Sequence, residues 1–142
     1  MEKTFKWWAC EVSDDQLKYL EMIQTLVERL ASNSFVLKGW SVTVATALLG
    51  FAGSQQNAQV ALLTLLPTLS FWGLDAYYLA QERRYRTLFG RVRKDQSTAF
   101  SFDALELRFR DWIKALFSVT TLFFHSPIVA VTVYLYFYWG AS

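Results

Sequence analysis

Cysteine, histidine and proline are all scarce in this chain, and long stretches of it carry no charge. Its 142 residues include one cysteine, Cys10, which cannot close an internal disulfide, so the sequence argues against a secreted disulfide-stabilised domain. No Lys, Arg, Asp or Glu occurs from Gly39 to Leu74 or from Ala115 to Ser142. Because about 20 apolar residues suffice to span a bilayer, these runs indicate an integral membrane protein rather than a soluble enzyme.

Recognisable catalytic motifs are also absent from the sequence. With His125 as its single histidine, the chain cannot supply the paired histidines of an intramembrane metalloprotease. An aspartyl protease needs two facing carboxylates, whereas the predicted spans hold one, Asp75. No nucleophile-elbow serine, P-loop or dinucleotide-binding glycine pattern occurs. We therefore expect a protein that is not an enzyme and uses no cofactor or metal.

Hydrophobic periodicity predicts an all-α integral membrane protein forming a single membrane domain over 1–142. An N-terminal amphipathic helix is expected at 14–32, because Ser13 and Gln16 resemble a capping box and apolar residues then recur at helical spacing. Three transmembrane helices are expected at 35–53, 58–80 and 115–139.

Two connections complete the predicted fold. The short uncharged link at 54–57 should make the first two spans a tight hairpin. The segment 81–114 should form a basic cytoplasmic helical hairpin, with a turn near 95–98 and a capping box at Asp103 and Glu106 before a helix that leads into the third span.

Lys and Arg are distributed asymmetrically, and this predicts the topology. Residues 81–114 hold nine of them, whereas the 54–57 link and the tail after Trp139 hold none. The positive-inside rule therefore places the N-terminus and the 81–114 segment in the cytoplasm and the C-terminus outside.

The basic segment has two interpretations that the sequence leaves open. Cytoplasmic loops are basic because topology requires it, and such residues also bind anionic lipid. The density here, with Tyr85 and Phe89 between the arginines, also suits phosphate binding and base stacking. The candidate ligands of a nucleotide or oligonucleotide phosphate are Arg83, Arg84, Arg86, Arg91, Arg93, Lys94, Arg108 and Arg110.

Polar residues inside the predicted spans are candidates for a pore or gate. Asp75 either pairs with an arginine or tyrosine of a neighbouring helix or forms an acidic ring at a pore mouth. His125 either hydrogen-bonds a neighbouring helix or lines a pore, where it would make conductance pH-sensitive. Thr121 either adds polar lining or bonds back to the helix backbone, and Pro127 is either a structural kink or a gating hinge.

One segment carries a likeness to a known family. In FWGLDAYYLAQERRYRTLF, residues 71–89, a membrane helix runs through LDAYYL into the basic QERRYR. With the N-terminal helix and the tight hairpin, this pattern resembles the SLATT-type small membrane effectors of bacterial antiphage defence, over about residues 14–95. The third span at 115–139 departs from the plainest two-span plan and leaves open which helix lines a pore.

The resemblance implies a function and a set of partners. It implies an oligomeric pore-forming effector of the bacterial inner membrane, in contact with membrane lipid and gated by a nucleotide or short single-stranded nucleic acid. A partner nucleotidyltransferase would make this signal, and pore opening would cause membrane depolarisation and growth arrest. We expect a homo-oligomer, with a tetramer as the working assumption.

Two other functions remain open from the sequence. A non-channel membrane adaptor would recruit a soluble partner through 14–32 and 81–111. Its binding face, unless packed against the other cytoplasmic helices, would comprise Leu20, Ile23, Val27 and Leu30. A small transporter is the third alternative, but transport does not account for the clustered cytoplasmic charge.

Overall fold

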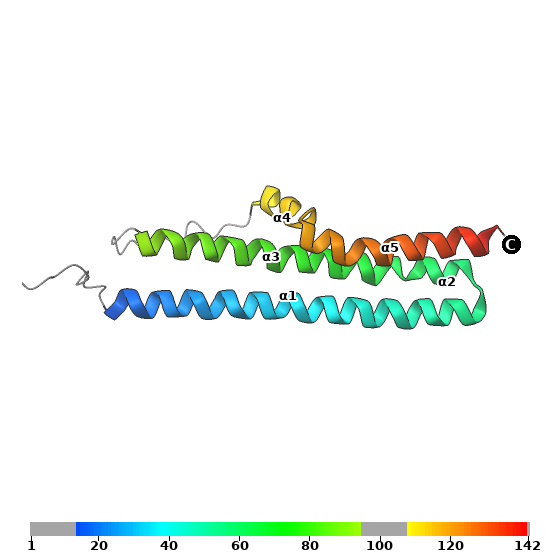
Figure 1. Ribbon diagram of the computed structural model, residues 1–142, viewed down its shortest axis with the longest axis horizontal. Helices are drawn as coiled ribbons and strands as arrows, with labels where there is room; N and C mark the ends of the chain where they lie inside the picture. The colour runs from blue at the N-terminus through cyan, green and yellow to red at the C-terminus, as the bar shows by residue number, and fades with distance from the viewer. Residues whose placement is uncertain (1–13, 95–107, 142) are drawn as a thin grey trace, which may run out of the picture.

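The computed structural model describes residues 14–94 and 108–141, and these are helical apart from short turns. The helices are α1 (Asp14–Gln55), α2 (Ala58–Leu63), α3 (Leu65–Lys94), α4 (Phe109–Leu116) and α5 (Val119–Gly140). They form an elongated bundle in which α1 extends along nearly the whole molecule and α2 and α3 return beside it (Figure 1). α5 lies along α2 and the first part of α3, and the C-terminus lies near the turn between α1 and α2.

The N-terminal half of the hairpin is a single uninterrupted helix. The sequence predicted separate helices at 14–32 and 35–53, but α1 continues through this point for 42 residues. The predicted interruption is wrong because Ser32, Asn33 and Ser34 lower helix propensity by less than about 1 kcal/mol each, and neither glycine nor proline stands among them. Ser34 is moreover buried in the finished fold, where its hydroxyl donates to Asp75.

The hairpin turn lies within the predicted 54–57 link. α1 ends at Gln55, and Gln56 adopts a positive φ of 47° that reverses the chain. Asn57 then caps α2, since its side-chain oxygen accepts from the backbone amides of Gln59 at 2.9 Å and Val60 at 3.3 Å. These bonds satisfy two of the free donors that begin any helix.

The two prolines within the predicted spans, Pro67 and Pro127, differ in their effect on the helix. The second span breaks at Thr64, between α2 and α3, and Pro67 stands in the first turn of α3. A proline there cannot donate to the carbonyl four residues earlier, and its ring crowds that carbonyl, which accounts for the break. Pro127, in contrast, lies inside α5, which stays continuous from Val119 to Gly140.

The third predicted span is divided in the structure. Ala115 and Leu116 belong to α4, and α5 begins only at Val119, after a corner at Phe117 and Ser118. The predicted start of this span at 115 is therefore wrong by four residues. The Thr121 hydroxyl stabilises the corner, because it lies 2.8 Å from the carbonyl oxygen of Ala115 and 2.9 Å from that of Ser118.

Two tryptophans fasten α4 to α3. The indole N–H of Trp72 donates to the carbonyl of Leu116 at 3.0 Å, and that of Trp112 donates to the carbonyl of Gly73 at 3.1 Å. The buried alanines of this contact, Ala76, Ala80 and Ala115, let the two helices approach closely. The predicted turn at 95–98 and the capping box at Asp103 and Glu106 lie outside the described residues.

Within residues 14–94 and 108–141, three helices are long and apolar enough to span a membrane, as the sequence predicted. They are α1, the α2–α3 pair from Ala58 to Arg93, and α5. Large apolar side chains cover the outside of these helices, whereas the buried side chains are mostly alanine, serine and threonine. This distribution is the reverse of that in a soluble bundle and suits a lipid environment.

Candidate functional site: an arginine groove beside a polar core

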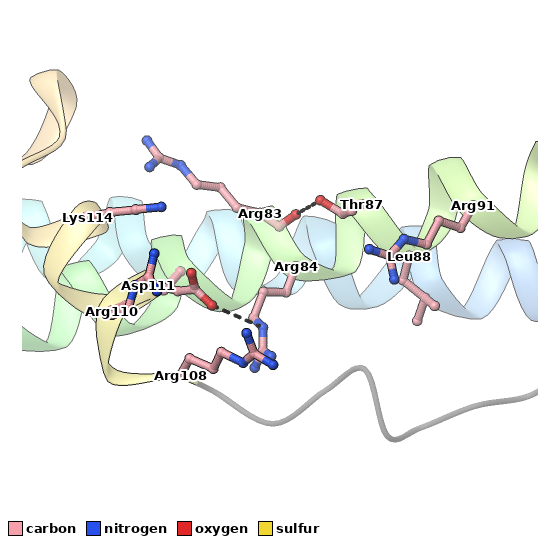
Figure 2. A pocket seen from close by; sticks show the side chains of 10 residues that line it. Arg83, Arg84, Thr87, Leu88, Arg91, Arg108, Arg110, Asp111 and Lys114 are labelled. Carbon is pink, nitrogen blue, oxygen red and sulfur yellow. Dashed lines mark hydrogen bonds and ion pairs between the residues drawn. The ribbon is translucent and has the colours of Figure 1, made fainter.

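A groove of about 620 Å³ opens between α3 and α4, and Arg108, the residue that precedes α4, also lines it. Figure 2 shows side chains of α3 and α4 converging on it, with Arg84, Arg108 and Asp111 close together. Its cationic lining consists of Arg83, Arg84, Arg91, Arg108, Arg110 and Lys114, and we call this site the arginine groove.

Negative charge in the arginine groove is sparse. Asp111 is the single carboxylate of the described lining, and the Nε atom of Arg84 lies 3.9 Å from an oxygen of this group. Among the described residues, six cationic side chains therefore face one carboxylate. The positive charges that line the groove repel one another, and a bound polyanion would relieve this repulsion.

The geometry of α3 explains which predicted arginines meet in the groove. Arg83, Arg84 and Arg91 line the groove from α3, although Arg83 and Arg84 leave the helix in different directions (Figure 2), and Arg108 and Arg110 line it from the start of α4. Arg86 and Arg93 are seven residues apart on a neighbouring face and do not line the groove.

The remaining members of the predicted set lie elsewhere. Arg86 is well exposed and pairs with Glu82 at 2.7 Å, one turn away on the same helix. The side chain of Lys94 lies outside the described residues. The prediction of eight phosphate ligands thus contains five residues that the structure brings together, and two that face away from them.

Lys114 lines the groove but was not among the predicted ligands. It is the last residue of the basic 81–114 segment, directly before the predicted third span. The spacing of α4 contained the missing signal, because Arg110, Asp111 and Lys114 recur at three and four residues and so share one face of a helix.

The described lining of the groove contains no aromatic ring, so Tyr85 and Phe89 do not stack a ligand there. Its hydrophobic lining is limited to Ala80 and Leu88. Guanidinium groups bind phosphate through paired N–H donors, which do not depend on the base of a nucleotide. The described lining therefore offers N–H donors of the kind that bind phosphate.

The predicted pore residues are divided between the core and the surface. Asp75, His125 and Thr121 are fully buried between the helices of a single protomer. Pro127 is exposed on α5. His125 stacks on Trp72, with ring centroids 5.8 Å apart, and its Nδ1 atom lies 3.1 Å from the carbonyl oxygen of Thr121.

Asp75 pairs with Lys38, whereas the sequence argument expected an arginine or a tyrosine. The ammonium of Lys38 lies 2.6 Å from Asp75 and 2.8 Å from the hydroxyl of Ser34, which also donates to Asp75. The register of the hairpin could have revealed this partner. Lys38 stands 18 residues before Gln56, and Asp75 stands 18 residues after Asn57, so the turn places them opposite each other.

Other proteins give no further guide to this site. Comparisons of the chain with protein-family models, with curated proteins and with solved structures found no match. The interpretation of the groove and of the core therefore depends on this chain's own residues.

The groove is directly connected to a candidate span. The guanidinium of Arg83 donates to the hydroxyl of Ser118 at 2.6 Å, and Ser118 forms the corner at which α4 turns into α5. Arg83 therefore both lines the groove and contacts the corner that precedes α5.

Proposed function

We propose that this protein is an oligomeric, pore-forming membrane effector that is controlled by a phosphate-rich ligand bound in the arginine groove. The observation that carries the proposal is the convergence of six cationic side chains on a groove whose described lining holds one carboxylate, next to the start of α5. The ligand class is a nucleotide or short oligonucleotide, since several phosphates can engage several arginines at once.

The effector role extends the likeness to SLATT-type membrane proteins. In that role the chain acts in bacterial antiphage defence in the inner membrane, catalyses no reaction itself, and receives its signal from a nucleotidyltransferase. Release or rearrangement of the corner at Ser118 would move α5 and open a path for ions. Depolarisation and growth arrest would follow.

The location of the polar residues constrains how such a pore forms. Asp75 and His125 are buried within one protomer, so they line a pore only if the helices of that protomer separate. A pore between protomers would instead be lined by faces that are now exposed. α5 offers one such face, with the large apolar side chains of Val119, Phe123 and Phe137.

The adaptor alternative has less support. Its proposed partner-binding face on α1 includes Ile23, which is 1% exposed, and the half-buried Leu20, Val27 and Leu30. α1 packs along α3 through this region. The face is thus already used inside the protomer, as expected for structural packing rather than recruitment.

Matched charge reversals on α3 and α4 test the ligand site. We expect Arg84→Glu with Arg108→Glu to weaken binding of a labelled short oligonucleotide at least tenfold, because each charge-assisted bond contributes about 1.5–3 kcal/mol. Arg86→Glu with Arg93→Glu makes the same change in net charge outside the groove and should have a smaller effect. Equal losses in the two double variants would show that the groove is not the site.

Ion flux in liposomes tests the pore and separates two sources of phosphate. Flux is measured with and without the oligonucleotide, in vesicles of zwitterionic lipid and in vesicles that contain anionic lipid. A change in flux with oligonucleotide in both vesicle types supports the proposal. Flux that responds only to anionic lipid assigns the groove to lipid headgroups, and no flux under any condition argues against a pore.

A further inference from the structure

Buried polar side chains occupy one face of each of the helices α1, α3 and α5. Ser34 and Ser41 are seven residues apart on α1, Thr68 and Asp75 are seven apart on α3, and Thr121 and His125 are one turn apart on α5. All six side chains are buried. Residues at these spacings lie on the same side of their helix, so the three polar faces meet in the interior of the bundle.

Part of this polarity is satisfied inside the protein. Thr68 and Thr132 donate to the carbonyls of Thr64 and Ile128, each one turn earlier at 2.8 Å. One oxygen of Asp75 accepts from Lys38 and Ser34. These bonds fix the helices but do not use every buried polar atom.

Four buried polar atoms have no hydrogen-bond partner among the described protein groups. They are Oδ2 of Asp75, Nε2 of His125, Oγ of Ser41 and Oγ1 of Thr64. An unsatisfied buried group costs about 1–3 kcal/mol, and more if charged, so four of them in one small core would be a large penalty. Ordered water normally satisfies such groups in native proteins.

The chemistry of the four atoms selects the ligand. A carbonyl oxygen accepts only, so Nδ1 of His125 carries the proton in its contact with Thr121 and leaves a lone pair on Nε2. Oδ2 of Asp75 is likewise an acceptor, whereas the two hydroxyls donate and accept. Water molecules match this combination, and a proton matches the lone pair of His125.

A metal cation fits the core less well than water and a proton. Lys38 already places a positive charge on Asp75 at 2.6 Å. Lys38 and Asp75 are the two charged side chains between positions 30 and 81, and His125 interacts electrostatically with both. α2 contributes no ionisable group, and the tyrosines of α5 lie two or more turns beyond His125.

We propose that the core of each protomer holds a chain of internal water molecules and binds a proton at Nε2 of His125. The proton comes from bulk water, passes along the internal water and forms an N–H bond on Nε2, and the imidazole becomes imidazolium. The unpaired oxygen of Asp75 supplies the nearest compensating negative charge. This site is separate from the arginine groove and does not depend on the ligand proposed for it.

Nitrogen NMR of the single histidine tests the proposal directly. The full-length protein is labelled with ¹⁵N-histidine and reconstituted in liposomes, so every imidazole signal belongs to His125. We expect the Nδ1–H tautomer near neutral pH, magnetisation transfer from water to Nε2, and conversion to imidazolium as the pH is lowered. An Nε2 signal with no water contact, and no imidazolium at any pH at which the protein stays folded, would overturn the proposal.

Two variants separate proton binding from a structural role. Asp75→Asn removes the compensating charge and should displace the titration by about one pH unit or more. Ser126→Ala changes the exposed neighbour of His125 and should leave the titration in place. If Asp75→Asn does not fold, the water contact and titration of the wild-type histidine decide the question alone.

Discussion

Lys38 and Asp75 illustrate how a pair of residues holds two candidate spans together. Asp75 is fully buried and Lys38 is 17% exposed, so neither charge is well solvated. Their attraction must offset the cost of removing both from water, and Ser34 assists by donating a third hydrogen bond to the site. The pair specifies the register between α1 and α3 as well as contributing energy.

Removal of Lys38 should show how strongly the stability of the fold depends on this pair. Lys38→Met leaves Asp75 buried without its counter-charge, and loss of one member of a buried pair costs about 3–5 kcal/mol. We expect a marked fall in thermal unfolding temperature in detergent. Lys18→Met removes an exposed lysine from the same helix and should have little effect.

The double variant Lys38→Met with Asp75→Asn tests whether the unpaired charge accounts for the loss of stability. It removes both charges and should recover a substantial part of the lost stability, because no uncompensated charge remains. A double variant no more stable than Lys38→Met would mean that packing, rather than charge pairing, accounts for the loss.

At the scale of the helices, backbone hydrogen bonding determines where elements begin and end. The 54–57 link was predictable because the polar, uncharged residues there interrupt two apolar runs, and Asn57 is a strong capping residue. The corner at Phe117 and Ser118 was not, because no glycine or proline marks it. Tertiary bonds from Thr121, Trp72 and Arg83 create it.

The same reasoning separates the predictable and unpredictable parts of the site. Helical spacing on α3 is sufficient to place Arg84 and Arg91, seven residues apart, on one side, but it does not place the adjacent Arg83 with them. The contribution of Arg108 and Arg110 to the same groove depends on how α4 folds against α3. No periodicity in the sequence encodes that packing.

The hairpin cap provides a test at this scale. Asn57→Ala removes the acceptor for the amides of Gln59 and Val60, and the expected loss is about 1 kcal/mol of unfolding free energy. Chemical unfolding in detergent measures the difference. Gln59→Ala changes the exposed side chain of a neighbour while keeping the cap, so an equal loss there would contradict the capping explanation.

The described part of the molecule divides along its length into a three-helix part near the hairpin turn and a part formed by α1 and α3. α1 extends about 63 Å at a rise of 1.5 Å per residue, roughly twice the thickness of a bilayer's hydrocarbon core. α1, the α2–α3 pair and α5 pack together towards the hairpin turn and form the three-helix part, whereas of the described helices α1 and α3 continue to the opposite end (Figure 1). The arginine groove lies near the junction between the two parts.

This arrangement makes the orientation in the membrane testable at both ends of α3. If the three-helix part spans the bilayer, the hairpin turn and the free ends of α1 and α3 lie on opposite sides, and the clustered arginines place the latter in the cytoplasm. In a Cys10→Ser background, Gln55→Cys should react with a membrane-impermeant maleimide in right-side-out vesicles, and Arg93→Cys only in inverted ones. The opposite pattern would reverse the topology. If both cysteines were labelled in right-side-out vesicles, residues 55 and 93 would lie on the same side of the bilayer. The three-helix part would then not cross the membrane.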